Sequence, residues 1–350
     1  MAAKLSFAEF DARLKSGALK AADYRKVLER DPTCPMVRVR FKPGALRDAP
    51  PAGYDVDREL YFAKRTEQER QLAALVPTGL KRILAEGDSW FNLPPIMWPE
   101  AIADRLHSNN RVVVKNIAHW GDTLSQMLAT KEYLEQIPRF NPDWFIFSGG
   151  GNDLQQSLAR GELVQTYDSN RPIEKCLSEQ GVGLLRDIAE GYRALLNQIA
   201  MAAPSLHTIC YAYDFPRPTY KDGKYIGQYL QKMGYPKTTW NAVVKVIIDH
   251  LSDSIKAVAK AFPNVRFLDC RGETTKYPFF DDMHPDTDGF KILASKYEQA
   301  FGVVPIRSSK PGTRTLTADR KQKPKGSRGS SKRGPARKVS KKNRTNPQRG

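Results

Sequence analysis

Ser89 lies in the segment Glu86-Gly87-Asp88-Ser89-Trp90, directly after the short apolar run 82–85 (RILA). A serine at a turn from a strand into a helix presents its hydroxyl at the edge of a sheet, where helix-terminal amides can stabilise a nearby negative charge. A serine hydroxyl is a weak nucleophile and needs a base to activate it. Ser89 is therefore a candidate nucleophile, although a serine in this position is also a common helix N-cap.

A candidate base occurs far along the chain, in the segment 281–285 (DDMHP). Of the five histidines, only His284 has a carboxylate three residues before it in a turn bounded by proline. At that spacing Asp281 and His284 can share one turn, so that Asp281 accepts the Nδ1 proton and Nε2 faces a serine. The pair predicts a base and the residue that orients it, and an ordinary surface turn is the alternative.

Two glycine-containing segments follow other apolar runs and could supply hydrogen-bond donors. The segment 148–153 (SGGGND) offers the side-chain amide of Asn152, and the segment 116–122 (NIAHWGD) offers the unobstructed backbone amide of Gly121. Such donors are what an oxyanion hole needs. The glycine run could alternatively bind phosphate, but it matches neither of the common nucleotide-binding patterns, GxGxxG and GxxxxGK[ST].

The elements that must position these residues form a regular alternation. Short apolar runs at 82–85, 111–118, 144–147, 206–213 and 265–270 alternate with helical patterns near 99–108, 123–136, 184–203, 240–262 and 287–301. Strands that alternate with helices predict a parallel sheet with helices on both faces. The candidate residues follow the carboxyl ends of strands or precede the last helix, so we expect one pocket at that edge.

Two insertions, near 154–183 and 214–239, interrupt this alternation after the carboxyl end of a strand. The second is rich in aromatic residues, which predicts either a substrate wall or lid, or rings that pack the insertion onto the domain. These residues are Phe215, Tyr220, Tyr225, Tyr229 and Tyr235, with Trp240 just after them.

The two ends of the chain differ from the middle. Residues 1–79 predict a helical extension, with a capping box at Ser6 and Glu9 and further helices over 21–30 and 57–75, which packs on the main domain over 80–304. Residues 305–350 contain 16 Lys or Arg and one acidic residue, and account for 15 of the 18 net positive charges. We expect this basic tail to be disordered. It either attracts polyanions such as nucleic acid or acidic surfaces, or only solubilises the protein.

The remaining features of the sequence argue against several classes of protein. No apolar run approaches the roughly 18 residues of a membrane span, and the first residues lack the apolar region of a secretory signal. The four cysteines are far apart and form no CxxC motif, so disulfide scaffolds and cysteine zinc sites have little support. A soluble, cytoplasmic protein is expected.

Together, the motifs resemble the SGNH (GDSL-type) hydrolase family over about residues 80–304. Its first block is similar to 87–89 (GDS), its second to Asn116-x-Ala118-x-x-Gly121, its third to Gly150-x-Asn152-Asp153 and its fifth to Asp281-x-x-His284. The resemblance implies Ser89 as nucleophile and oxyanion donor, backbone and side-chain donors at Gly121 and Asn152, and His284 as a base oriented by Asp281. It implies no metal or organic cofactor. The segment 90–94 (WFNLP) departs from the family pattern, so no substrate preference is transferred.

We therefore predict a flavodoxin-like three-layer α/β/α sandwich with a five-stranded parallel sheet. Its expected activity is hydrolysis of a small-molecule or acylated ester by double displacement. The alternative is a polyanion-binding protein that uses the basic tail and carries a catalytically silent α/β platform. Labelling of Ser89 by a fluorophosphonate would distinguish the two functions.

Overall fold

The computed structural model describes residues 4–75, 79–109 and 111–303. The described residues belong to one compact unit, which contains both the N-terminal extension and the α/β domain. The basic tail predicted to be disordered lies outside the described residues.

The core of the molecule is a five-stranded parallel sheet in the order β4-β3-β5-β6-β7. Its strands are β3 (Arg82–Glu86), β4 (Val113–Asn116), β5 (Trp144–Phe147), β6 (His207–Tyr211) and β7 (Val265–Leu268). The central strands are apolar without alternation because both of their faces are buried. The order is that of a flavodoxin-like sandwich, as predicted.

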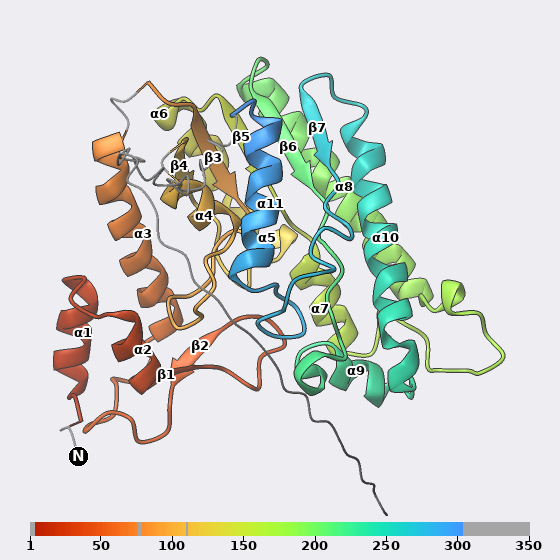
Figure 1. Ribbon diagram of the computed structural model, residues 1–350, viewed down its shortest axis with the longest axis horizontal. Helices are drawn as coiled ribbons and strands as arrows, with labels where there is room; N and C mark the ends of the chain where they lie inside the picture. Colours follow the sequence, from red (N-terminus) through yellow and green to blue (C-terminus); the bar gives the residue numbers. More distant parts are fainter. Residues whose placement is uncertain (1–3, 76–78, 110, 304–350) are drawn as a thin grey trace, which may run out of the picture. The chain divides into compact units, whose positions relative to one another are not determined.

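Helices cover both faces of the sheet (Figure 1). One layer contains α4 (Ile102–Ser108) packed against α11 (Thr287–Ala300). In the other layer α8 (Glu179–Ala202) packs against α5 (Leu124–Thr130), α6 (Glu132–Phe140) and α10 (Trp240–Ala259). The prediction of a single helix over 123–136 was wrong. Lys131 has a left-handed backbone, φ 51°, which ends α5, and α6 begins at the next residue.

The N-terminal extension is helical only in part. It contains α1 (Phe7–Lys15), α2 (Ala21–Val27), β1 (Leu28–Arg30), β2 (Val39–Phe41) and α3 (Val56–Leu75). The capping box at Ser6 is present. The helix expected over 21–30 ends at Val27, because Leu28 is extended and begins an antiparallel hairpin with β2. Helix α3 packs on β4 and so covers one edge of the sheet.

The two insertions add short helices beside the carboxyl edge of the sheet. The first contains α7 (Gly151–Ala159) and the 3-10 turn η2 (Ile173–Lys175). The second contains η3 (Tyr220–Gly223), α9 (Gly227–Lys232) and η4 (Lys237–Thr239). Figure 1 shows α7 and α9 at the same end of the molecule as the β1–β2 hairpin.

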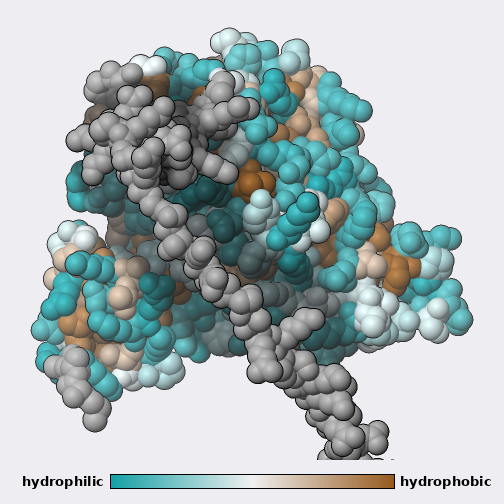
Figure 2. All heavy atoms as spheres, viewed as in Figure 1, coloured by the Kyte–Doolittle hydropathy of each residue, from teal (hydrophilic) through white to brown (hydrophobic). Residues whose placement is uncertain are grey.

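The visible surface of the described residues is mostly hydrophilic, with small separate hydrophobic patches (Figure 2). Most of the large apolar side chains lie instead in a continuous core that joins the extension to the sheet. None of the helices in the described part of the chain is long and apolar enough to cross a membrane.

Candidate active site

Ser89 follows β3 in a tight turn. The amides of Phe91 and Asn92 both donate to the Asp88 carbonyl at 3.0 Å, and the Trp90 amide donates to the Asp88 carboxylate. The expected passage from strand directly into helix is wrong, since the next helix begins only at Ile102. The prolines at 94 and 95 explain this difference because they cannot continue a helix begun at Ser89.

The structure brings Ser89 and His284 together across 195 residues of sequence. The Ser89 Oγ lies 2.8 Å from the His284 Nε2, and the His284 Nδ1 lies 3.0 Å from the Asp281 Oδ1. The Asp281 Oδ1 also accepts the backbone amides of Met283 and His284, which fixes the turn between the two residues. The imidazole of His284 is fully buried. The arrangement can move a proton from the serine hydroxyl to the imidazole.

Gly121 and Asn152, the other two predicted oxyanion donors, lie near each other, because Asn152 bonds to the residue after Gly121. Gly121 has φ 88°, and a Cβ there would lie 2.7 Å from the Val37 carbonyl oxygen, so the position requires glycine. Within the described residues, neither the Ser89 amide nor the Gly121 amide donates to a protein acceptor. The Asn152 side chain donates to the Asp122 carbonyl at 2.7 Å, which places it beside the Gly121 loop.

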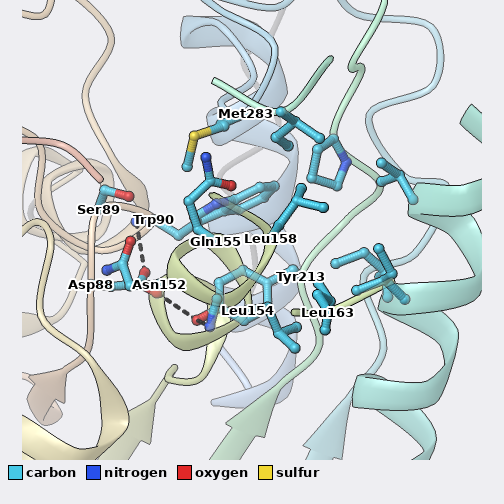
Figure 3. A pocket seen from close by; sticks show the side chains of 16 residues that line it. Asp88, Ser89, Trp90, Asn152, Leu154, Gln155, Leu158, Leu163, Tyr213 and Met283 are labelled. Atoms are coloured by element: carbon cyan, nitrogen blue, oxygen red, sulfur yellow. Dashed lines mark hydrogen bonds between the residues drawn. The ribbon is translucent and has the colours of Figure 1, made fainter. Parts of the chain in front are cut away.

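Ser89 and Asn152 open into one pocket at the carboxyl edge of the sheet (Figure 3). Gly121 is not part of its lining. Beyond the polar end the lining is mostly aliphatic and comes from α7, α10, the two insertions and the turn that carries His284. These residues include Leu154, Leu158, Leu163, Pro216, Ile226, Val244, Ile247, Ile248 and Met283.

The aromatic residues predicted as a possible lid do not form the wall of this pocket. Pro216 and Ile226 line it from the second insertion, but none of that insertion's rings does so within the described chain. The rings instead pack the insertion: the Tyr235 hydroxyl donates to the Gln165 carbonyl, and Tyr167 packs on Tyr235. At this pocket, these rings therefore pack the insertion onto the domain and do not form a substrate wall.

Asp88, next to the serine, is a buried carboxyl group at the floor of the site. Burial raises the pKa of Asp88 to about 6, although hydrogen bonds from the Tyr213 hydroxyl and the Trp90 amide favour its charged form. The Tyr213 hydroxyl also accepts the Gly151 amide at 3.3 Å, and so ties the turn after β3 to the start of α7. Sequence reasoning did not identify Tyr213, which follows β6 as Ser89 follows β3.

Two further residues near the site were missed. Arg30, from the extension, donates to the Asp281 Oδ2 at 3.0 Å. Asp282 accepts the amides of Tyr225 and Ile226 at 3.0 and 2.7 Å, and so holds the second insertion against the turn that carries His284. Asp282 could have been found from its place beside Asp281, whereas no local pattern marks Arg30.

The described residues contain no group of three or more His, Cys, Asp or Glu side chains that could hold a metal ion.

Comparison with known proteins finds three solved structures that are similar to part of this chain. An acetylxylan esterase from Geobacillus stearothermophilus is 17% identical, with 64% of this chain and 95% of that chain covered and a TM-score of 0.39. A lipase from a goat rumen metagenome is 17% identical, with 63% and 97% covered and a TM-score of 0.41. An alpha/beta hydrolase from the metagenome of Lake Arreo is 15% identical, with 64% and 96% covered and a TM-score of 0.39. Curated protein sequences give no match.

The family comparison covers more than half of the chain. The model of the GDSL-like lipase/acylhydrolase family matches residues 84–292, which span the sheet from β3 to α11 and include every predicted site residue. The chain belongs to this GDSL-like (SGNH) family and is a hydrolase that acts on esters.

Proposed function

We propose that the protein is a serine esterase that uses Ser89 as nucleophile, His284 as base and Asp281 as the residue that orients the base. The observation that carries the proposal is the buried chain of contacts from Ser89 through His284 to Asp281, which opens at Ser89 into an apolar pocket. The apolar lining supports an acyl chain, rather than a polar group, as the part of the substrate beside the serine.

The reaction proceeds by double displacement. Ser89 Oγ attacks the carbonyl carbon of the ester while its proton passes to His284 Nε2. The carbonyl oxygen becomes negative and accepts hydrogen bonds from the Ser89 and Gly121 amides and the second amide hydrogen of Asn152. The intermediate collapses as His284 protonates the departing alcohol. Water then attacks the acyl-enzyme while His284 takes its proton. The bond from the acyl carbon to Ser89 Oγ breaks, the acid leaves, and His284 returns the proton to Ser89.

The test is turnover of an ester series with acetyl, butyryl and octanoyl groups on one chromogenic alcohol. Wild-type protein should cleave at least one member of the series, and Ser89→Ala should remove that turnover while its far-UV circular dichroism and melting temperature stay unchanged. Tyr220→Phe, in the second insertion but outside the pocket, is the matched control and should keep wild-type turnover. Wild-type rates in Ser89→Ala would refute the mechanism.

We further propose a three-part organisation of the chain: an N-terminal extension over 1–79, the hydrolase domain over 80–304 and a basic tail over 305–350. The charge of the tail supports contact with polyanions. All four cysteines are free thiols, which supports a reducing, cytoplasmic location.

A further inference from the structure

The guanidinium of Arg30 lies against the carboxylate that orients the candidate base. Its Nη1 donates to the Asp281 Oδ2 at 3.0 Å, and each of the two side chains is only 9% exposed. The Arg30 guanidinium carbon also lies 3.2 Å from the ring centroid of Tyr225 in the second insertion. Arg30 therefore joins three parts of the chain: the β1–β2 hairpin, the turn that carries His284, and the second insertion.

Asp281 is thereby shared between the imidazole of His284 and the guanidinium of Arg30. His284 Nδ1 lies within 3.1 Å of both carboxylate oxygens, while Arg30 binds the Oδ2. Burial acts to raise the pKa of Asp281, but the charge and hydrogen bond of His284 and the charge of Arg30 outweigh it and lower the pKa to about 2. The carboxylate is thus charged throughout the working pH range, and Arg30 uses one of its acceptor sites, on Oδ2.

The segment that follows Arg30 contacts the other side of the site. The side chains of Gln155 and Gln156, on α7, donate to the Pro35 carbonyl at 3.3 Å and the Met36 Sδ at 2.8 Å. The Val37 carbonyl lies where a Cβ at Gly121 would collide. The extension therefore contacts the candidate oxyanion loop, the helix that carries Asn152 and the turn of the base.

We propose that Arg30 is a positioning residue of the hydrolase, which holds the Asp281 carboxylate in the orientation that His284 needs and offsets part of its charge. The inference rests on the proposed function, because it concerns the same base. The proposal gives the N-terminal extension a part in catalysis. The ion pair between Arg30 and Asp281, which are 251 positions apart in the sequence, completes the site.

The charge of Arg30 should influence the protonation of His284, which a purely packing role of Arg30 would not do. Several other charged or titratable groups face Arg30, Asp281 and His284. Asp88 interacts electrostatically with His284, Asp282 and Tyr225 interact with Asp281, and Cys34 and Tyr229 interact with Arg30. After the interactions with His284, the charge of Arg30 is the largest influence that lowers the pKa of Asp281. Without Arg30, the uncompensated carboxylate would favour the imidazolium over the neutral imidazole that accepts the serine proton.

The experiment compares pH profiles of kcat/KM for wild type, Arg30→Met and Arg30→Lys, with an ester that the wild type cleaves. Activity rises with pH as the base becomes neutral, so in Arg30→Met this acid limb should move to higher pH by about 0.5–1 unit. At pH values below the pKa of the base, a shift of this limb by one pH unit lowers kcat/KM tenfold. Arg30→Lys keeps the charge and should keep the limb at its wild-type position, with a lower plateau because it loses the planar contacts.

Arg40→Met is the matched control, since Arg40 lies in the same hairpin and pairs with Glu29 rather than with the site. The pH profile of kcat/KM for Arg40→Met should be that of the wild type.

Two results for Arg30→Met would overturn the proposal. An equal loss of kcat/KM at every pH would mean that Arg30 is merely structural, and an unchanged pH profile would mean that Arg30 has no role. If circular dichroism shows that Arg30→Met does not fold, the test rests on Arg30→Lys. A displaced acid limb in the kcat/KM profile of Arg30→Lys contradicts the proposal. Ser89→Ala in the same assay separates this outcome from failure of the proposed function, which would appear as retained activity in that variant.

Discussion

At the scale of single residues, Asn152 shows how the candidate oxyanion hole is prepared before substrate binds. One hydrogen of its side-chain amide is used by the Asp122 carbonyl, which leaves the other for a ligand oxygen. Its position in the first turn of α7 is fixed by Gly150, whose φ of 92° turns the chain from β5 into the helix. The side chain is thus held in place, so little reorganisation is needed as charge develops in the transition state.

Asn152→Ala should therefore lower kcat by about 10²–10³, with little change in KM, because the lost hydrogen bond strengthens only in the transition state. Steady-state kinetics of purified protein would measure both constants. Gln156→Ala, on the same helix but outside the pocket, is the control and should retain a near wild-type kcat. A raised KM with unchanged kcat in Asn152→Ala would assign Asn152 to ground-state binding instead.

At the scale of elements, the depth of the apolar pocket depends on α7 and α10. Leu158 lies one turn beyond Leu154 on α7, and Figure 3 shows both side chains at the pocket, with Ser89 at its polar end. An acyl chain that extends from the serine must pass these side chains. Their size therefore limits the length of acyl chain that fits.

Leu158→Trp should shorten the pocket. We expect kcat/KM for an octanoyl ester to fall about tenfold or more, since the buried chain loses roughly 0.8 kcal/mol for each methylene group that no longer fits. The acetyl ester serves as the internal control and should be cleaved at the wild-type rate. Equal losses for both esters would indicate damage to the fold, and no loss for either would place the acyl chain elsewhere.

The elements also show what sequence can and cannot predict. The five strands were predictable because each is a short, largely apolar run, and the central strands are buried on both faces. Ser89, Gly121 and Asn152 were found because each follows one of these strands. The β1–β2 hairpin was missed because 28–30 continues a helical pattern and gains its strand conformation only by pairing with 39–41. Arg30 was missed because its partner is distant in sequence and leaves no local pattern.

At the scale of the whole molecule, charge and predicted catalytic residues are separated along the chain. All residues of the candidate site lie before residue 304, whereas 15 of the 18 net positive charges lie after it. Removal of residues 306–350 should thus leave turnover of a small neutral ester nearly unchanged. The same deletion should abolish binding to heparin or DNA, which in the full chain should weaken steeply with salt.

Ester kinetics and polyanion affinity over a salt series, measured on both proteins, test this separation. Polyanion binding that survives the deletion would place the binding surface on the folded unit. A loss of ester turnover would mean that the tail takes part in the site.

The central claim is that His284 activates Ser89, and covalent labelling tests it most directly. A fluorophosphonate should modify the wild type at a single residue, identified as Ser89 by peptide mass spectrometry. His284→Ala should slow the labelling by several orders of magnitude, and Ser89→Ala should abolish it, with both variants folded by circular dichroism. Labelling of a different residue, or of Ser89 at an equal rate without His284, would contradict the account.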